Sequence, residues 1–502
     1  MANMREAYLR LRQDDKSILY GAREEELQIE VTDYYVRFLP KDDFEMAILS
    51  EQDSLVLSDF PLDYEIEEGV AGAYHDPTVA KDRITWQYTV VPRDYMFRDM
   101  EYEILAVLFL QEDEEEVGGK TAVNRLKRQL VGIQWRELEN EAFRITANEE
   151  YVEEWNKEDK GEAARKSWYP SGRIMYEDNT TGEILPIAGV KVMVKRWFKV
   201  KEAITNSQGY FYVSKFKSKK VKCGIKWESG DWDIRSGSYG QAWYSYETLK
   251  RGDQWRKTIM KSGTPLNWLY ASVHRGAREY MYGHYRYGIR KPNANGGPGA
   301  KIRIGVRDKS GRAHYFSFNS LVGSAEVLIY SREKSGKVLD SRDLFATAVH
   351  ELAHVSHWDL GYTNAEFAAS AVGKPNDPRL PESWAVGVEY TVTNAYYPDR
   401  GYWKYDFPYE FNLQNLTLED IEDQKGYTPI VIDMIDDYNQ SERDKKGEEY
   451  PNDRASGYTL GQLEDALPRG FGGWWKWKSR IQDKFDNPTE GEELDYLFSE
   501  YH

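Results

Sequence analysis

The segment that begins at Asp340 and ends near Gly361 constrains the fold more strongly than any other part of the chain. Asp340 has the chemistry of a helix N-cap, Gly361 is typical of a helix end, and apolar residues recur between them at helical spacing. We therefore predict one helix over this segment. Because side chains four residues apart lie on the same helix face, His350 and His354 are expected to project together from it.

His350 and His354 frame the pattern H-E-x-x-H, with Glu351 between them. Two imidazoles on one helix face can bind a single zinc ion at about 2.0–2.1 Å. Glu351 lies one residue further round the helix, where its carboxylate can reach a metal-bound water and act as general base. His357 as a fourth ligand would close the position that this water needs, so we interpret it as a neighbouring or surface histidine.

A catalytic zinc site needs a third protein ligand. The metzincin pattern fails, because His357 stands where a glycine is expected and Leu360 where a histidine is expected. Residues 381–390, P-E-S-W-A-V-G-V-E-Y, instead resemble the N-E-G-x-A-x-x-x-E helix of thermolysin-like and aminopeptidase-like gluzincins. The resemblance implies that Glu382 is the third zinc ligand, with Glu389 as the alternative.

Two features depart from the gluzincin pattern. Glu382 follows His354 by 28 positions, a longer separation than in the family, so we expect an inserted loop near Asn364–Leu380. Val386 stands four residues after Glu382, where thermolysin-like proteins carry an aspartate behind the metal ligand. The sequence therefore offers no counterpart for that aspartate.

The same resemblance suggests a residue that stabilises the oxyanion. Aminopeptidase-like gluzincins place a tyrosine just before a downstream helix, and Gly426-Tyr427-Thr428-Pro429 opens a predicted helix at a comparable place. This implies that Tyr427 donates to the oxyanion. A packed core tyrosine is the equal alternative for Tyr427, and Tyr390 and Tyr397 are further candidates.

A second match concerns the exopeptidase families, which carry G-x-M-E-N upstream of the metal motif. The segment Gly323-Ser324-Ala325-Glu326 keeps only the glycine and the glutamate of that pattern. In those families the glutamate holds the amino terminus of the substrate. We interpret Glu326 instead as an exposed residue of a strand.

Residues 165–262 contain short strands separated by turns. Val190–Trp197 alternates apolar and basic residues, as a half-buried strand does. The runs Gly189–Val192 and Thr205–Phe211 resemble transthyretin-like, carboxypeptidase-regulatory-like modules. The resemblance implies a β-sandwich with an accessory role.

The charge of the chain is uneven. Its net charge of −17 argues against a nucleic-acid binder, whose surface is basic. Residues 161–261, in contrast, carry 20 Lys and Arg against 10 Asp and Glu. We interpret these cations as an outer face that prevents edge-to-edge strand pairing. The alternative is a docking face for an acidic partner.

These patterns predict a multidomain α+β protein without disulfides, since the chain has 1 cysteine. We expect an N-terminal α+β domain of unknown role over residues 1–155 and a transthyretin-like β-sandwich over 165–262. A zincin catalytic core, with a mixed sheet and the active-site helix, follows over 263–400. A helical C-terminal subdomain over 401–502 is expected to complete the cleft.

The predicted function is that of a zinc-dependent peptidase acting on peptide or protein substrates. The alternative is a surface protein that binds peptide or glycan and retains a vestigial metal site. The longest apolar run, Ile104–Leu110, is too short for a membrane span, and no signal peptide is visible. The resemblance to secreted gluzincins implies an extracytoplasmic location with the leader missing from this chain; the cytoplasm is the alternative.

Overall fold

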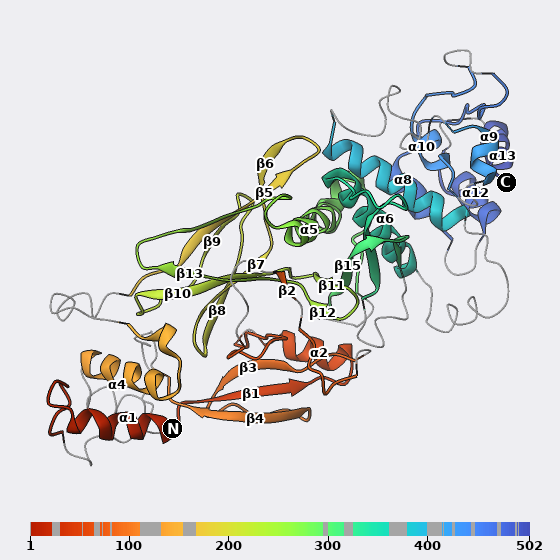
Figure 1. Cartoon of the computed structure of the whole chain (residues 1–502). Helices are drawn as coiled ribbons and strands as arrows, with labels where there is room; N and C mark the ends of the chain where they lie inside the picture. Colours follow the sequence, from red (N-terminus) through yellow and green to blue (C-terminus); the bar gives the residue numbers. More distant parts are fainter. Residues whose placement is uncertain are drawn as a thin grey trace. The chain divides into compact units, whose positions relative to one another are not determined.

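A computed structural model describes residues 2–22, 31–52, 54–64, 71–72, 74–80, 83–110, 132–153, 167–294, 300–315, 325–360, 379–398, 414, 416–423, 427–442, 447–468, 473–486, 489 and 491–502. The chain forms several sheets and a helical C-terminal region, which confirms the predicted α+β class (Figure 1). It divides into two compact units. Unit 1 comprises Met1–Met175, Pro186–Ser229 and Gly240–Thr258, and unit 2 comprises Tyr176–Leu185, Gly230–Tyr239 and Ile259–His502. The division into four domains stays a prediction.

The N-terminal part of unit 1 contains an antiparallel sheet and a pair of helices. The sheet has the order β3 (Gln87–Pro92), β1 (Asp33–Leu39), β4 (Glu101–Leu108). Helix α2 (Asp43–Ser50) follows β1. Helices α1 (Ala2–Gln13) and α4 (Gly132–Ile145) pack through Leu11, Trp135 and Leu138. Helix α4 is described from Gly132 onward, and residues 111–131 lie outside the described residues.

The chain also forms two further sheets. One has the order β2 (Ala71–Gly72), β13 (Trp243–Lys250), β10 (Lys220–Lys226), β7 (Lys191–Arg196), β8 (Lys199–Ile204). The other has the order β14 (Trp255–Ile259), β5 (Ser171–Asp178), β6 (Glu183–Pro186), and β9 (Tyr210–Tyr212) pairs with β5. The predicted turn before β9 is confirmed: Gly209 has φ 80°, and a Cβ there would lie 2.4 Å from the carbonyl oxygen of Ile174.

Strand β7 is buried on both faces, so the prediction of a half-buried strand is wrong here. Val192, Met193 and Val194 are all fully buried, and Met193 packs in a cluster with Phe60 and Trp243. Phe60 covers the second face. It comes from the N-terminal part of the chain, 133 positions before Met193. Periodicity within one strand cannot reveal such a distant partner.

Two lysines of these strands are buried. Lys195 Nζ donates to the carbonyl oxygen of Leu62 at 3.0 Å, and Lys226 Nζ lies 2.6 Å from a carboxylate oxygen of Glu228. Buried cations that already have partners add little to a basic docking surface. An acidic partner for this region stays a prediction that rests on other lysines.

Unit 2 is built on a mixed sheet that contains, in order, β11 (Trp232–Ser236), β15 (Ile302–Ser310), β17 (Val327–Arg332) and β16 (His314–Tyr315). Strands β11, β15 and β17 are parallel to one another, and β16 pairs antiparallel to β17 at the edge. Strand β11 lies inside the range predicted for the β-sandwich but pairs with β15. Strands β15, β17 and β16 come from residues 263–400, the range for which a mixed sheet is predicted.

Three long helices of unit 2 pack side by side (Figure 1): α5 (Pro265–Gly283), α6 (Ser341–Asp359) and α8 (Arg379–Tyr396). The expected extent of α6 is confirmed. Gly276 permits the close approach of α5 to α6, because a Cβ there would lie 2.5 Å from the carbonyl oxygen of Phe345.

The C-terminal helices are α9 (Leu418–Asp423), α10 (Ile430–Ile435), α11 (Leu460–Ala466), α12 (Trp474–Lys484) and α13 (Gly491–Glu500). A capping box formed by Thr459 and Gln462 begins α11. None of the helices in the described part of the chain combines the length and the apolar character that a membrane span requires.

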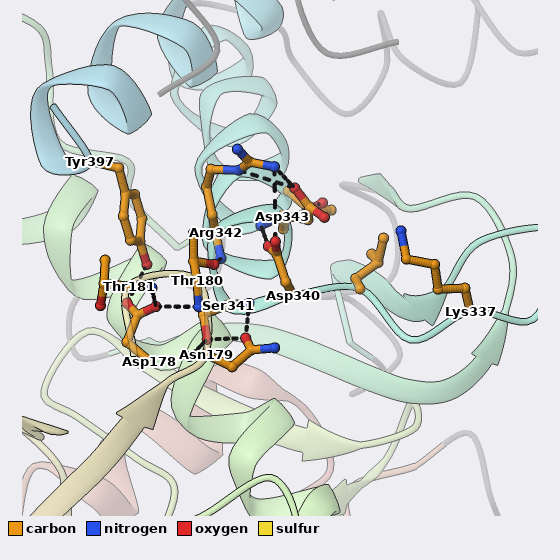
Figure 2. Close-up of polar contacts among 12 residues, drawn as sticks. Asp178, Asn179, Thr180, Thr181, Lys337, Asp340, Ser341, Arg342, Asp343 and Tyr397 are labelled. Carbon is orange, nitrogen blue, oxygen red and sulfur yellow. Dashed lines mark hydrogen bonds and ion pairs between the residues drawn. The ribbon is translucent and has the colours of Figure 1, made fainter. Parts of the chain in front are cut away.

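A turn after β5 holds the N-terminus of α6 (Figure 2). Asn179 Oδ1 accepts from the backbone N–H and from the hydroxyl of Ser341, both at 2.8 Å. Thr180 Oγ1 accepts from the backbone N–H of Arg342 at 3.1 Å, and Asp340 accepts from the backbone N–H of Asp343 at 2.9 Å. Side chains thus satisfy the first free N–H groups of the helix.

The same turn is connected to α5 and to the end of α8. Asp178 is fully buried, and its Oδ2 accepts from Arg275 Nη1 at 2.9 Å and from the Tyr397 hydroxyl at 2.8 Å. Figure 2 shows Tyr397 pointing toward Asp178. These bonds fix the position of the start of α6 within unit 2. The positions of the histidines on α6 follow from it.

Candidate metal centre

Helix α6 presents His350 and His354 to α8, which carries Glu382 in its first turn. One potential ligand atom from each of these three residues lies within 4.8 Å of the other two. Glu382 Oε2 is 3.4 Å from His350 Nε2 and 3.5 Å from His354 Nε2. The structure therefore brings together the three residues predicted as metal ligands, although 28 positions separate His354 from Glu382.

Packing of the opposite face of α6 directs the histidines toward α8. Leu344, Ala348 and Leu352 are completely buried, as the helical spacing predicts. An inserted loop is expected between the helices. Its residues up to position 378 lie outside the described part of the chain, and Arg379 already belongs to α8. Glu382 is thus held by a helix and not by a loop.

Glu389 lies behind His350 and not among the three clustered ligand atoms. Its Oε2 is 3.0 Å from His350 Nδ1. Because a carboxylate can only accept, Nδ1 must carry the hydrogen, and Nε2 is then free to bind a metal. Such a carboxylate orients the imidazole and increases its basicity. Glu389, the alternative third ligand, is thus placed to orient His350.

The charges of the site favour binding of a cation. Burial lowers the pKa of His350, but the carboxylates of Glu382 and Glu389 outweigh it and raise the pKa to about 10. Burial raises the pKa of Glu382, yet the two histidines hold it well below its usual range. A proton on His350 therefore offsets the charge of these carboxylates, and a divalent cation can take its place.

Glu351 is buried beside the metal ligands. It is 3% exposed, and burial raises the pKa of its carboxyl group. Within the described residues its Oε2 has no hydrogen-bond partner. A buried acceptor atom without a donor is costly unless a further group binds it, so Glu351 fits a site that holds a metal ion with its water.

Tyr427 lies next to the histidines. Its ring is stacked on that of His350, with centroids 6.1 Å apart and planes inclined by 24°. Burial and the nearby Glu382 carboxylate raise the pKa of Tyr427 well above its ordinary value. Gly426, which precedes Tyr427 in the predicted motif, lies outside the described residues.

Sequence reasoning missed Arg312, which also lies at the site. Arg312 is in the turn between β15 and β16, and its Nη2 donates to the Tyr427 hydroxyl at 2.5 Å. Both Glu382 and Glu351 act electrostatically on this guanidinium. No local pattern marks Arg312, because 115 positions separate it from Tyr427.

Other predicted residues have different places. Tyr397 binds Asp178, and Tyr390 lines a cavity of about 270 Å³ together with residues of α8 and α10. His357 is 3% exposed and Glu326 is 2% exposed, so neither is a surface residue. The interpretation of Glu326 as an exposed strand residue is wrong: it directly precedes β17, which lies inside the sheet between β15 and β16.

No protein-family model matches the chain, and none of the curated proteins shows a significant match to it. The class of site is therefore defined by its geometry and chemistry alone: two histidines and one glutamate around a metal position, with a second, buried glutamate beside them.

Proposed function

We propose that this protein is a zinc-dependent peptidase of the gluzincin type. The observation that carries the proposal is the convergence of His350, His354 and Glu382 within 4.8 Å of one another, with Glu351 buried beside them. Three protein ligands leave one position for water, as catalytic zinc sites do, whereas structural zinc sites are closed by four protein ligands. The sequence resemblance to gluzincins supports a peptide bond as the target.

The proposed roles follow from the chemistry of each side chain. A zinc ion held by the three ligands would supply a Lewis acid and a water of lowered pKa. Glu351 takes the proton of the attacking water and returns it to the leaving amine; a raised pKa suits both transfers near neutral pH. Tyr427 donates its hydroxyl hydrogen to the oxyanion of the tetrahedral intermediate.

Zinc analysis by mass spectrometry, combined with a terminal-proteomics screen of a peptide library, tests the proposal. The parent protein is expected to bind one zinc ion and to cleave peptides. Glu351→Gln should keep zinc and lose turnover, because the amide cannot accept the proton. Glu382→Ala should lose zinc, because it removes the only carboxylate among the three proposed ligands.

Two outcomes contradict the proposal. If Glu382→Ala binds zinc as tightly as the parent protein, the ligand assignment is wrong. If the parent protein holds stoichiometric zinc and cleaves no peptide in the library, the result supports the alternative, a binding protein with a vestigial site.

A further inference from the structure

Arg312 and Tyr427 form a pair beside the metal position that the proposed roles do not yet explain. Arg312 is exposed, and its guanidinium carbon lies 5.4 Å from the centroid of the Tyr427 ring. Its Nη2 donates a hydrogen bond of 2.5 Å to the phenol oxygen. The long side chain of an exposed arginine loses conformational entropy when it is held in this way, so the contact requires an explanation.

The hydrogen bond determines the direction of the phenol hydrogen. A tyrosine hydroxyl has one hydrogen to donate and can also accept. Because Arg312 carries no acceptor, the phenol oxygen must accept from it, and the phenol hydrogen must point elsewhere. On its other side the tyrosine faces Glu382 and the stacked ring of His350. The phenol also forms a hydrogen bond with Glu382, and because a carboxylate only accepts, its hydrogen is directed toward Glu382 and so toward the candidate metal position, where an oxyanion would form.

We infer that Arg312 is a positioning residue that holds Tyr427 as the oxyanion donor. The inference rests on the proposed peptidase function. A charge-assisted hydrogen bond to the phenol oxygen also makes the O–H group a stronger donor as negative charge develops on the substrate. Strand β16 and the turn before it lie at the edge of the sheet, and through Arg312 this edge would contribute to catalysis without touching the metal.

A double-mutant cycle with Arg312→Ala and Tyr427→Phe tests this inference. Loss of one oxyanion donor costs about 100-fold in kcat elsewhere, and we expect this of Tyr427→Phe. Arg312→Ala should lower kcat about 10-fold with little change in KM, because it misplaces the donor and does not remove it. In the Tyr427→Phe background, Arg312→Ala should have almost no further effect, because the two residues act as a unit.

Three measurements separate positioning from a loss of structure. Zinc content and thermal unfolding of Arg312→Ala should match those of the parent protein. Arg312→Lys should recover part of the lost kcat, because an ammonium can still donate one hydrogen bond. Lys309→Ala is the matched control: it removes another exposed cation three residues before Arg312, at the end of β15, and its kcat should equal that of the parent.

Binding of a phosphinic peptide, which mimics the tetrahedral intermediate, gives a readout that does not depend on turnover. Affinity of the zinc-loaded protein for this peptide should fall in Arg312→Ala and in Tyr427→Phe, and no further in the double variant. Independent, multiplicative losses in kcat or in affinity contradict the inference. An effect confined to the KM of substrates with a free terminal carboxylate also contradicts the inference. Arg312 would then bind the carboxylate of the substrate.

The failure of this inference can be distinguished from failure of the proposed function. If the parent protein cleaves peptides but the two variants have independent effects, only the proposed role of Arg312 is wrong. A parent protein that binds zinc but neither cleaves peptides nor binds the phosphinic peptide contradicts both proposals.

Discussion

At the scale of single residues, Glu389 shows how a side chain outside the metal ligands shapes the site. Its contact with His350 Nδ1 leaves Nε2 facing Glu382 and His354. Glu389 is seven positions after Glu382 on the same helix, so about two turns of α8 place both carboxylates toward α6. One helix thus supplies both the proposed ligand and the residue that orients the ligand opposite it.

We expect Glu389→Ala to weaken zinc binding about 10- to 100-fold, because His350 loses the acceptor that selects its tautomer and orientation. Competition with a chromophoric chelator measures this affinity. Glu419→Ala is the matched control, since it removes an exposed carboxylate from α9. Equal zinc affinity in Glu389→Ala and the control variant would show that Glu389 does not orient the histidine.

At the scale of secondary-structure elements, the position of α6 depends on close packing with α5 and on the turn after β5. Gly276 lets the two helix backbones approach, while Asn179 and Thr180 bind the first turn of α6. Both sets of contacts act on the N-terminal half of α6. Together they place the histidines relative to the sheet before any metal binds.

Gly276→Ala is expected to lower the free energy of unfolding by about 2 kcal/mol, because the added methyl group overpacks the α5–α6 contact. Its Cβ would lie 2.5 Å from the carbonyl oxygen of Phe345. Gly263→Ala is the control, because nothing lies within 4 Å of its added Cβ. Denaturant unfolding of both variants measures the difference, and equal stability would argue against tight packing here.

At the scale of the whole molecule, the metal position and its supporting network all lie in unit 2. His350, Glu382, Asp178 and Tyr427 belong to its segments Tyr176–Leu185 and Ile259–His502. A ligand that binds only the folded state stabilises the unit that contains its site. Metal binding should therefore affect the two units differently.

Calorimetry should show zinc raising the unfolding temperature of one transition and leaving the other unchanged. At a free zinc concentration of 100 times Kd the stabilisation is about 2.7 kcal/mol. A chelator should reverse the shift, and Glu382→Ala should abolish it. A shift of equal size in both transitions, or in neither, would contradict a zinc site confined to unit 2.

The local patterns of the sequence determined much of what the structure shows. The capping residue Asp340 and the spacing of His350, Glu351 and His354 defined α6 and the common face of its two histidines, because helix geometry depends on neighbours only a few positions apart. Glu382 was found through a short motif on a second helix. These are properties of single elements.

Only the tertiary structure decided which elements meet. Glu389 proved to face the back of His350, Arg312 proved to bind Tyr427, and β7 proved to be covered on its second face. Each of these contacts joins positions far apart in the chain. Their free energy comes from packing and hydrogen bonds between elements, which no periodicity within one element encodes.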